Sequence, residues 1–209
     1  MYPVSYAADY AADGRNRLTT FFRYLVAIPW LIVAYVYGIV ASIATTITWF
    51  VMIFTGRYPE GLYNFNAGYL RMISRVNGFQ YLLTDDYPPF GGEEAPEFPI
   101  RVGVPEPLDK YSRAKAFFRY LIGIPVMILA FVQALILMVV TVIAWFAILF
   151  TGKHPDGLFN PGRSAAAYLT RTSAYFMLIT EDWPPFSLED GAGASAGQIQ
   201  SEAASRTTT

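Results

Sequence analysis

Two long apolar stretches dominate the pattern of hydrophobic and polar positions along the chain. Residues 24–56 contain no Asp, Glu, Lys, Arg or His, and residues 120–152 repeat this pattern. Each stretch exceeds the roughly 20 helical residues that cross the hydrocarbon core of a membrane. The pattern therefore predicts an all-α integral membrane protein.

Each apolar stretch is compatible with two arrangements. It can form one tilted helix that crosses once, or a hairpin that turns near residues 37–38 and 133–134. A hairpin places every ionisable residue on one side, as the positive-inside rule favours, with Arg23 and Arg119 at the headgroups. We therefore expect a transmembrane hairpin in each half and four spans in total. A single crossing would instead invert one half relative to the other.

The stretch after each apolar run has helical periodicity. On a helical wheel, Phe65, Met72 and Phe79 fall on one side of residues 64–80, and Arg71 and Arg75 fall on the other. The later stretch has the same arrangement, with Arg171 on its polar side. These patterns predict an amphipathic helix in each half, lying at the membrane surface or packed as a lid on its own hairpin.

Short segments with alternating apolar residues precede both apolar runs. Residues 3–6 and 99–102 are prone to an extended or β conformation, and we expect them to pair if both halves face one way.

The chain is an internal repeat at an offset of 96 residues. Residues 17–90 and 113–186 align without a gap and share 29 identities in 74 positions. We therefore divide the chain into a membrane repeat (1–90), an acidic, Pro-rich linker (91–109), a second membrane repeat (110–186) and a disordered polar tail (187–209).

The composition narrows the class of protein. Only 15% of the 209 residues are charged, against about 25% in a typical soluble domain. The chain has no Cys, one His and a net charge of −1, which argues against a disulfide framework and a nucleic-acid partner. Residues 1–16 lack the features of a cleavable signal peptide, so we expect the first apolar segment to direct insertion.

A loop motif recurs after each apolar run, with Arg57 in the first copy and Lys153 in the second. Gly56 and Gly152 suit a helix C-terminus, and a cation complements the negative end of the helix dipole. Capping is the favoured interpretation, and contact of the two cations with lipid headgroups is the alternative.

Four further charges occupy equivalent positions in the two copies, namely Arg75 and Arg171, and Asp86 and Asp182. An Arg–carboxylate pair within each copy is the favoured interpretation, ahead of lipid phosphate contact or a transport pathway. Trp49 and Trp145 suit interfacial anchors, and the threonines at 45, 46 and 48 suit bonds to helix carbonyls or across helices.

No residues combine into a catalytic, cofactor-binding or metal-binding constellation. His154 aligns with Tyr58 in the first copy, and no nucleophile accompanies the carboxylate pairs at 85–86 and 181–182. We therefore expect no enzyme activity and no cofactor.

The strings FFRYLVAIP, WFVMIFTGRYPEGLYNF and TDDYPPF recur as FFRYLIGIP, WFAILFTGKHPDGLFN and TEDWPPF. Together they resemble a bacterial membrane-protein family catalogued as domain of unknown function 4389, in two tandem copies. The second copy departs from the first at Lys153, His154 and Ala167. The resemblance implies a bacterial inner-membrane protein with paired membrane helices, and it carries no catalytic residues.

These features favour a non-catalytic accessory, scaffold or lipid-interacting protein of the bacterial inner membrane. It would be multi-pass, with most charges cytoplasmic, and its partners would be lipids and possibly a membrane protein. A small transporter or channel built from the two repeats is the alternative.

Overall fold

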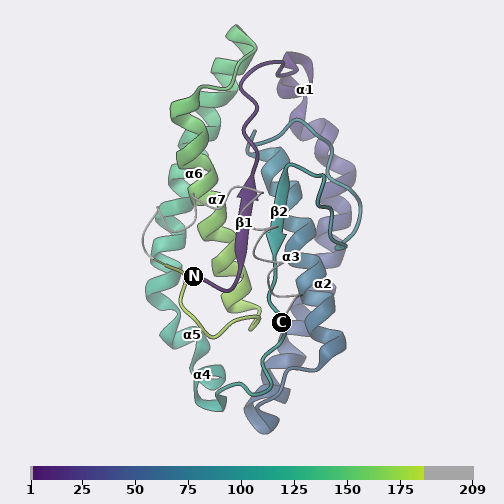
Figure 1. Cartoon of the computed structure of the whole chain (residues 1–209), viewed down its shortest axis with the longest axis vertical. Coiled ribbons are helices and arrows are strands. Elements are labelled where there is room, and N and C mark those ends of the chain that lie inside the picture. The colour runs from purple at the N-terminus through teal and green to yellow at the C-terminus, as the bar shows by residue number, and fades with distance from the viewer. Residues whose placement is uncertain (1, 186–209) are drawn as a thin grey trace, which may run out of the picture.

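The computed structural model describes residues 2–185, so the tail expected at 187–209 lies outside the described residues. Figure 1 shows how the elements follow one another. In chain order they are β1 (Ser5–Ala8), α1 (Arg17–Phe21), α2 (Arg23–Thr55), α3 (Glu60–Gln80), β2 (Ile100–Gly103), α4 (Arg113–Phe117), α5 (Arg119–Ile122), α6 (Ile124–Thr151) and α7 (Asp156–Phe176). The expected acidic linker therefore contains β2.

The first apolar run forms the long helix α2, and all but the start of the second forms α6, so the expected hairpins are wrong. α2 continues for 33 residues through positions 37 and 38, and α6 continues for 28 residues through position 133. Gly38 stays helical because its missing side chain leaves room for the Tyr69 ring, whose hydroxyl oxygen would lie 2.8 Å from a Cβ there. A lone Gly costs a helix only about 1 kcal/mol, and tertiary packing offsets that cost.

The two amphipathic helices are confirmed as α3 and α7. They lie between α2 and α6 in Figure 1, and each packs most extensively on the long helix of its own repeat. Arg75, Val76 and Phe79 of α3 are all buried. The helices therefore pack as the expected lid on their own repeats, and both of their faces contact protein.

The two extended segments are also confirmed, and they pair. β1 and β2 form an antiparallel ribbon in which Tyr6 lies opposite Val102. The ribbon runs along α7 and α3, where β1 contacts α7 and β2 contacts α3 (Figure 1). Val4, Tyr6 and Ile100 are buried between the ribbon and these helices.

Equivalent residues of the two repeats meet at a pseudo-twofold axis. Tyr6 and Val102 are 96 positions apart and lie opposite each other in the ribbon. Ser74 of α3 and Thr170 of α7 are also 96 positions apart, and their hydroxyl oxygens lie 3.2 Å from each other. Because the ribbon is antiparallel, the pseudo-twofold axis is perpendicular to the two strands.

The same symmetry makes α2 and α6 antiparallel. The Trp145 indole, near the end of α6, donates to the Thr20 carbonyl oxygen just before α2, at 3.0 Å. The Trp49 indole, near the end of α2, donates to the Ala116 carbonyl oxygen just before α6, at 2.8 Å. These bonds join the two repeats, and the role of both tryptophans as interfacial anchors stays a prediction.

Candidate functional site

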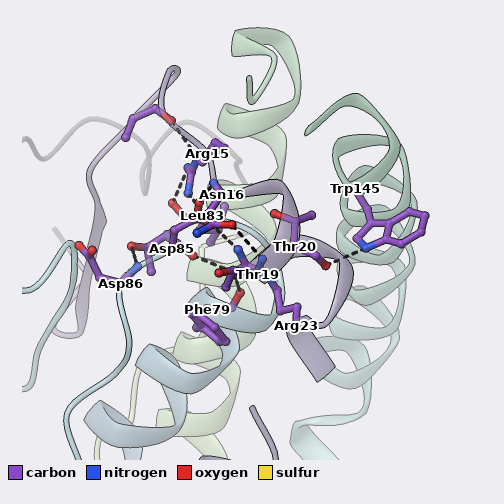
Figure 2. A network of polar contacts seen from close by, with 12 residues as sticks. Arg15, Asn16, Thr19, Thr20, Arg23, Phe79, Leu83, Asp85, Asp86 and Trp145 are labelled. Atoms are coloured by element: carbon purple, nitrogen blue, oxygen red, sulfur yellow. Dashed lines mark hydrogen bonds and ion pairs between the residues drawn. The ribbon is translucent and has the colours of Figure 1, made fainter. Parts of the chain in front are cut away.

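A buried arginine organises the start of each long helix. Arg23 is the first residue of α2 and is 2% exposed. Its guanidinium donates to the carbonyl oxygens of Phe79 and, at 2.9 Å, of Thr84, and it pairs with the Asp85 carboxylate (Figure 2). It also lies over the Phe79 ring, 4.5 Å from the centroid. This burial rules out the expected headgroup contact of Arg23.

A tight turn after α3 places two backbone carbonyl oxygens at the Arg23 guanidinium. Leu82 adopts a left-handed conformation with φ of 62°, and the Leu83 amide then donates back to the Gly78 carbonyl oxygen at 2.9 Å. A left-handed Leu costs about 1–2 kcal/mol. The turn reverses the chain, so that the Phe79 and Thr84 carbonyl oxygens face the same guanidinium.

Asp85 joins a second cation to this network. Its carboxylate pairs with Arg15 at 3.3 Å and accepts a hydrogen bond from the backbone amide of Asn16 at 3.0 Å. The Asn16 side chain in turn caps α1 by accepting from the Thr19 amide at 3.0 Å (Figure 2). Two guanidinium groups and one carboxylate meet here, so the cluster carries one net positive charge.

The second repeat keeps the arginine but rearranges its partners. Arg119 is also 2% exposed, donates to the Thr180 carbonyl oxygen and lies 4.0 Å from the Tyr175 ring centroid. Glu181 replaces Asp85, accepts from the Ser112 amide and pairs with Lys115 at 3.4 Å. Burial therefore also excludes the headgroup contact expected for Arg119.

The expected pairing of Arg75 with Asp86 and of Arg171 with Asp182 is wrong. Arg75 donates to the Glu93 carbonyl oxygen at 2.6 Å, and Arg171 donates to the Val4 carbonyl oxygen at 3.3 Å. Asp86 and Asp182 instead lie in short turns, in which the backbone amide of each donates to the Thr hydroxyl two residues earlier. Asp85, the neighbour of Asp86, is the carboxylate that pairs with the buried Arg23, whereas Glu181, the neighbour of Asp182, pairs with Lys115.

Arg71 lies at the edge of α3 and pairs with Glu94 at 3.1 Å. Glu94 is 78% exposed, so this pair faces the solvent side of the linker. The Arg71–Glu94 pair lies level with the middle of α2. Gly92, close to Glu94 in sequence, packs against Gly68 of α3, and the next residue of α3, Tyr69, packs against Gly38 of α2.

The recurrent loop motif is confirmed as a helix cap. Gly56 and Gly152 end α2 and α6 with φ of 69° and 73°, the left-handed conformation that glycine favours. The Lys153 ammonium forms an exposed pair with Asp13 at 2.8 Å. The backbone amide of Arg57 donates to the Thr55 hydroxyl at 3.1 Å, which tightens the same turn.

Position 58 and its equivalent, 154, join the two repeats through buried side chains. Tyr58 donates to the Met177 carbonyl oxygen at 3.1 Å and accepts from the Asn66 amide at 2.7 Å. Burial raises the pKa of Tyr58 to about 12. His154 is 2% exposed, and burial lowers the pKa of its imidazole. These contacts between the repeats could not be predicted from the sequence, since the residues that they join lie more than 100 positions apart.

The Asn66 amide also donates to the Thr45 hydroxyl at 3.1 Å, and the Thr46 hydroxyl donates to the Ser42 carbonyl oxygen at 2.9 Å. The bonds predicted across helices and to helix carbonyls are thus confirmed for Thr45 and Thr46, whereas the Thr48 hydroxyl forms neither of these bonds within residues 2–185.

Within residues 2–185, no group of three or more His, Cys, Asp or Glu side chains could hold a metal ion. The polar clusters instead fix the ends of helices and the contact between repeats.

A family model for the domain of unknown function DUF4389 matches the chain twice, over residues 17–91 and 113–187. The chain belongs to the DUF4389 family. The two matches coincide with the two repeats of this DUF4389 protein. A search of curated proteins and a search of solved structures returned no match.

The described part of this DUF4389 protein has an extensive exposed apolar surface on α2 and α6. α2 and α6 are each long and apolar enough to cross a membrane, and only 17% and 28% of their most apolar windows are buried. Their outer faces expose large side chains from end to end. On α2 these include Leu25, Ile28, Ile32, Ile39, Ile43, Phe50 and Phe54, and on α6 Ile124, Ile128, Phe131, Leu135, Met138, Val142, Phe146 and Phe150.

Proposed function

We propose that this DUF4389 protein is a non-catalytic, lipid-interacting accessory protein of the bacterial inner membrane, which holds lipid along the outer faces of α2 and α6. The observation that carries the proposal is the continuous row of exposed Ile, Leu, Val, Met and Phe side chains on both helices. An exposed apolar surface of this extent marks a membrane or protein contact.

The composition of the two helices favours lipid as the main contact. α2 and α6 are apolar on all sides, with mean hydropathies of 2.1 and 2.9 over their most apolar windows. One side of each helix packs on α3 or α7, so a water-facing polar side is missing from both helices. A helix that is apolar all round sits between a protein core and lipid.

The position of Glu94 favours an arrangement in which α2 and α6 lie along the membrane plane. α2 is about 50 Å long at 1.5 Å per residue, and the hydrocarbon core is about 30 Å thick. If α2 stood upright, the exposed Glu94 would lie near mid-depth, where a carboxylate is costly.

Lying flat places the apolar faces in lipid and leaves Glu94 and the Arg101–Asp9 pair in water. The pseudo-twofold axis then points along the membrane normal, and both repeats meet the membrane in the same way. The ionisable residues also share one side, which is the distribution that first favoured hairpins.

Flotation of the full chain with liposomes of bacterial lipid tests the proposal. Ile39 and Leu135 are equivalent positions on the outer faces of α2 and α6, and they are 46% and 44% exposed. We expect Ile39→Asp combined with Leu135→Asp to lower the liposome-bound fraction at least about tenfold. The control is Leu108→Asp, since Leu108 is 50% exposed but lies in the linker. Equal loss in the control and the double variant would overturn the proposal.

A small transporter is the second candidate, because α2 and α6 run antiparallel about a pseudo-twofold axis, as inverted repeats do. Solute flux in proteoliposomes that disappears in Arg75→Ala with Arg171→Ala would favour it over the accessory role. In the structure both arginines are buried against backbone carbonyl oxygens.

A further inference from the structure

A cavity of about 150 Å³ lies where the start of α2, the end of α3 and the second half of α6 meet. It opens on the apolar side of the molecule, since Tyr24 and Val142 in its wall are 65% and 50% exposed. A cavity of this size accommodates a six-carbon ring, so it can hold a segment of a hydrocarbon chain. Its lining residues are Arg23, Tyr24, Gln80, Leu82, Thr141, Val142 and Trp145.

The second repeat shows what normally occupies the position of Gln80. Its equivalent is Phe176, whose ring stacks on Tyr120 at a centroid distance of 6.0 Å. The same ring lies 2.7 Å from an ideal Cβ on Gly123. A bulky ring thus covers the start of the long helix in repeat 2, and the exchange of Phe for Gln leaves space in repeat 1.

A second, independent difference between the repeats leaves the hydroxyl of Thr141, in the wall of the same cavity, without a hydrogen-bond partner in the described part of the chain. In repeat 1 the Thr45 hydroxyl accepts from the Asn66 amide at 3.1 Å. In repeat 2 the equivalent pair is Thr141 and Gly162, so the amide donor is missing. Thr141 is 9% exposed, and its hydroxyl has no hydrogen-bond partner within residues 2–185.

The polar atoms of the cavity select a ligand that accepts hydrogen bonds. Arg23 Nε carries a hydrogen and also lacks a partner within the described part of the chain. Buried donors of this kind cost free energy until an acceptor reaches them. The net positive charge of the nearby Arg15–Asp85–Arg23 cluster further favours an oxygen ligand that carries partial or full negative charge.

We propose that this cavity binds one fatty acyl chain by its carbonyl end, with the Thr141 hydroxyl and Arg23 facing the carbonyl oxygen and Trp145 and Leu82 packing on the chain. The assignment rests on the proposed contact of α2 and α6 with lipid. The acyl group could belong to a diacyl phospholipid or to a free fatty acid, since an ester carbonyl and a carboxylate both present an oxygen that accepts hydrogen bonds.

Photo-crosslinking of the purified full chain in detergent tests the site. One arm uses palmitic acid with a diazirine near the carboxyl end, and the other uses a phosphatidylglycerol with the same group in one acyl chain. We expect saturable labelling at the cavity residues, suppressed by an excess of unlabelled lipid of the same class. The arm with the stronger labelling identifies the source of the acyl group.

Two variants change the cavity by single side-chain exchanges that we expect the fold to tolerate. Gln80→Phe introduces the residue of the second repeat and should abolish labelling at the cavity. Thr141→Val keeps the shape, removes the hydroxyl and should weaken labelling about fivefold. The control, Thr46→Val, changes an exposed α2 threonine to the residue found at its equivalent, Val142, and should leave labelling unchanged.

Labelling spread evenly over the outer faces of α2 and α6, unsaturable and unchanged by Gln80→Phe and Thr141→Val, would overturn the site. Flotation with liposomes, measured on the same preparations, separates this outcome from failure of the proposed function. A chain that floats without labelling at the cavity binds membranes but lacks the site. A chain with labelling at the cavity that does not float has the site but not the proposed membrane contact.

Discussion

The hydroxyl groups of Ser74 and Thr170 lie 3.2 Å apart at the pseudo-twofold axis that relates the two repeats. The two residues are 3% and 7% exposed, so water does not replace the bond readily when one hydroxyl is removed. α3 and α7 therefore meet through a pair of equivalent residues, and this contact is one of several that join the two repeats.

The first prediction concerns this contact. Ser74→Ala and Thr170→Val should each lower the free energy of unfolding by about 1 kcal/mol, because each leaves one buried hydroxyl unpaired. The double variant should cost clearly less than the sum of the two, with a coupling of about 1 kcal/mol. Chemical unfolding of all four proteins in detergent measures the cycle. Strict additivity would show that the two hydroxyls do not interact.

The second prediction concerns Asp85. Asp85→Asn leaves Arg23 buried with its charge uncompensated and should lower the free energy of unfolding by about 3 kcal/mol or more. The matched control is Glu94→Gln, which breaks a pair whose carboxylate is 78% exposed and should cost less than about 1 kcal/mol. Thermal unfolding under the same conditions compares the two, and similar losses would contradict a structural role for the Arg23 cluster.

The third prediction concerns the helix caps. Gly56→Ala should lower the free energy of unfolding by about 1–2 kcal/mol, because φ is 69° and a Cβ would lie 3.2 Å from the Tyr111 carbonyl oxygen. Gly61→Ala is the control, since Gly61 is in the first turn of α3 with open space around it, and it should be neutral or stabilising by up to about 1 kcal/mol. If both variants lost equal stability, the capping role of Gly56 would be wrong.

The fourth prediction concerns pH. Burial lowers the pKa of the His154 imidazole below its ordinary value of 6.5, so the unfolded chain takes up this proton first on acidification. The contribution of His154 to stability is complete above pH 6.5 and is lost as the pH falls toward the lowered pKa. His154→Gln should flatten this part of the profile of unfolding free energy against pH. A profile identical to that of the wild type would show that His154 titrates alike in both states.

Local chemistry allowed much of the fold to be predicted. The offset of 96 residues, the periodicity of α3 and α7, the extended segments that form β1 and β2, and the capping glycines all depend on residues close together in sequence. The hairpins were wrong because a sequence gives only the order of the charges along the chain. In the folded protein the linker returns along α2, so the proposed flat arrangement brings charges separated in sequence to one side without a turn at Gly38.

The candidate site was harder to predict for the same reason. Arg23 is expected at the headgroups because it borders an apolar stretch, and its actual partner, Asp85, lies 62 residues away in the sequence. The cavity depends on two differences between the repeats: repeat 1 has Gln80 where repeat 2 has Phe176, and repeat 2 has Gly162 where repeat 1 has Asn66. The effect of these differences can be recognised only when the two folded repeats are compared.

Depth measurement by electron paramagnetic resonance tests the central claim most directly. Because the chain has no Cys, single nitroxide labels can be placed at Ile28, Ile39 and Phe50 along the outer face of α2, and at Glu94, without background substitutions. In liposomes, the account predicts one common shallow depth for the three helix positions and free access of an aqueous relaxant to position 94. A depth that is greatest at position 39, with position 94 shielded from water, would contradict it and show that α2 crosses the bilayer.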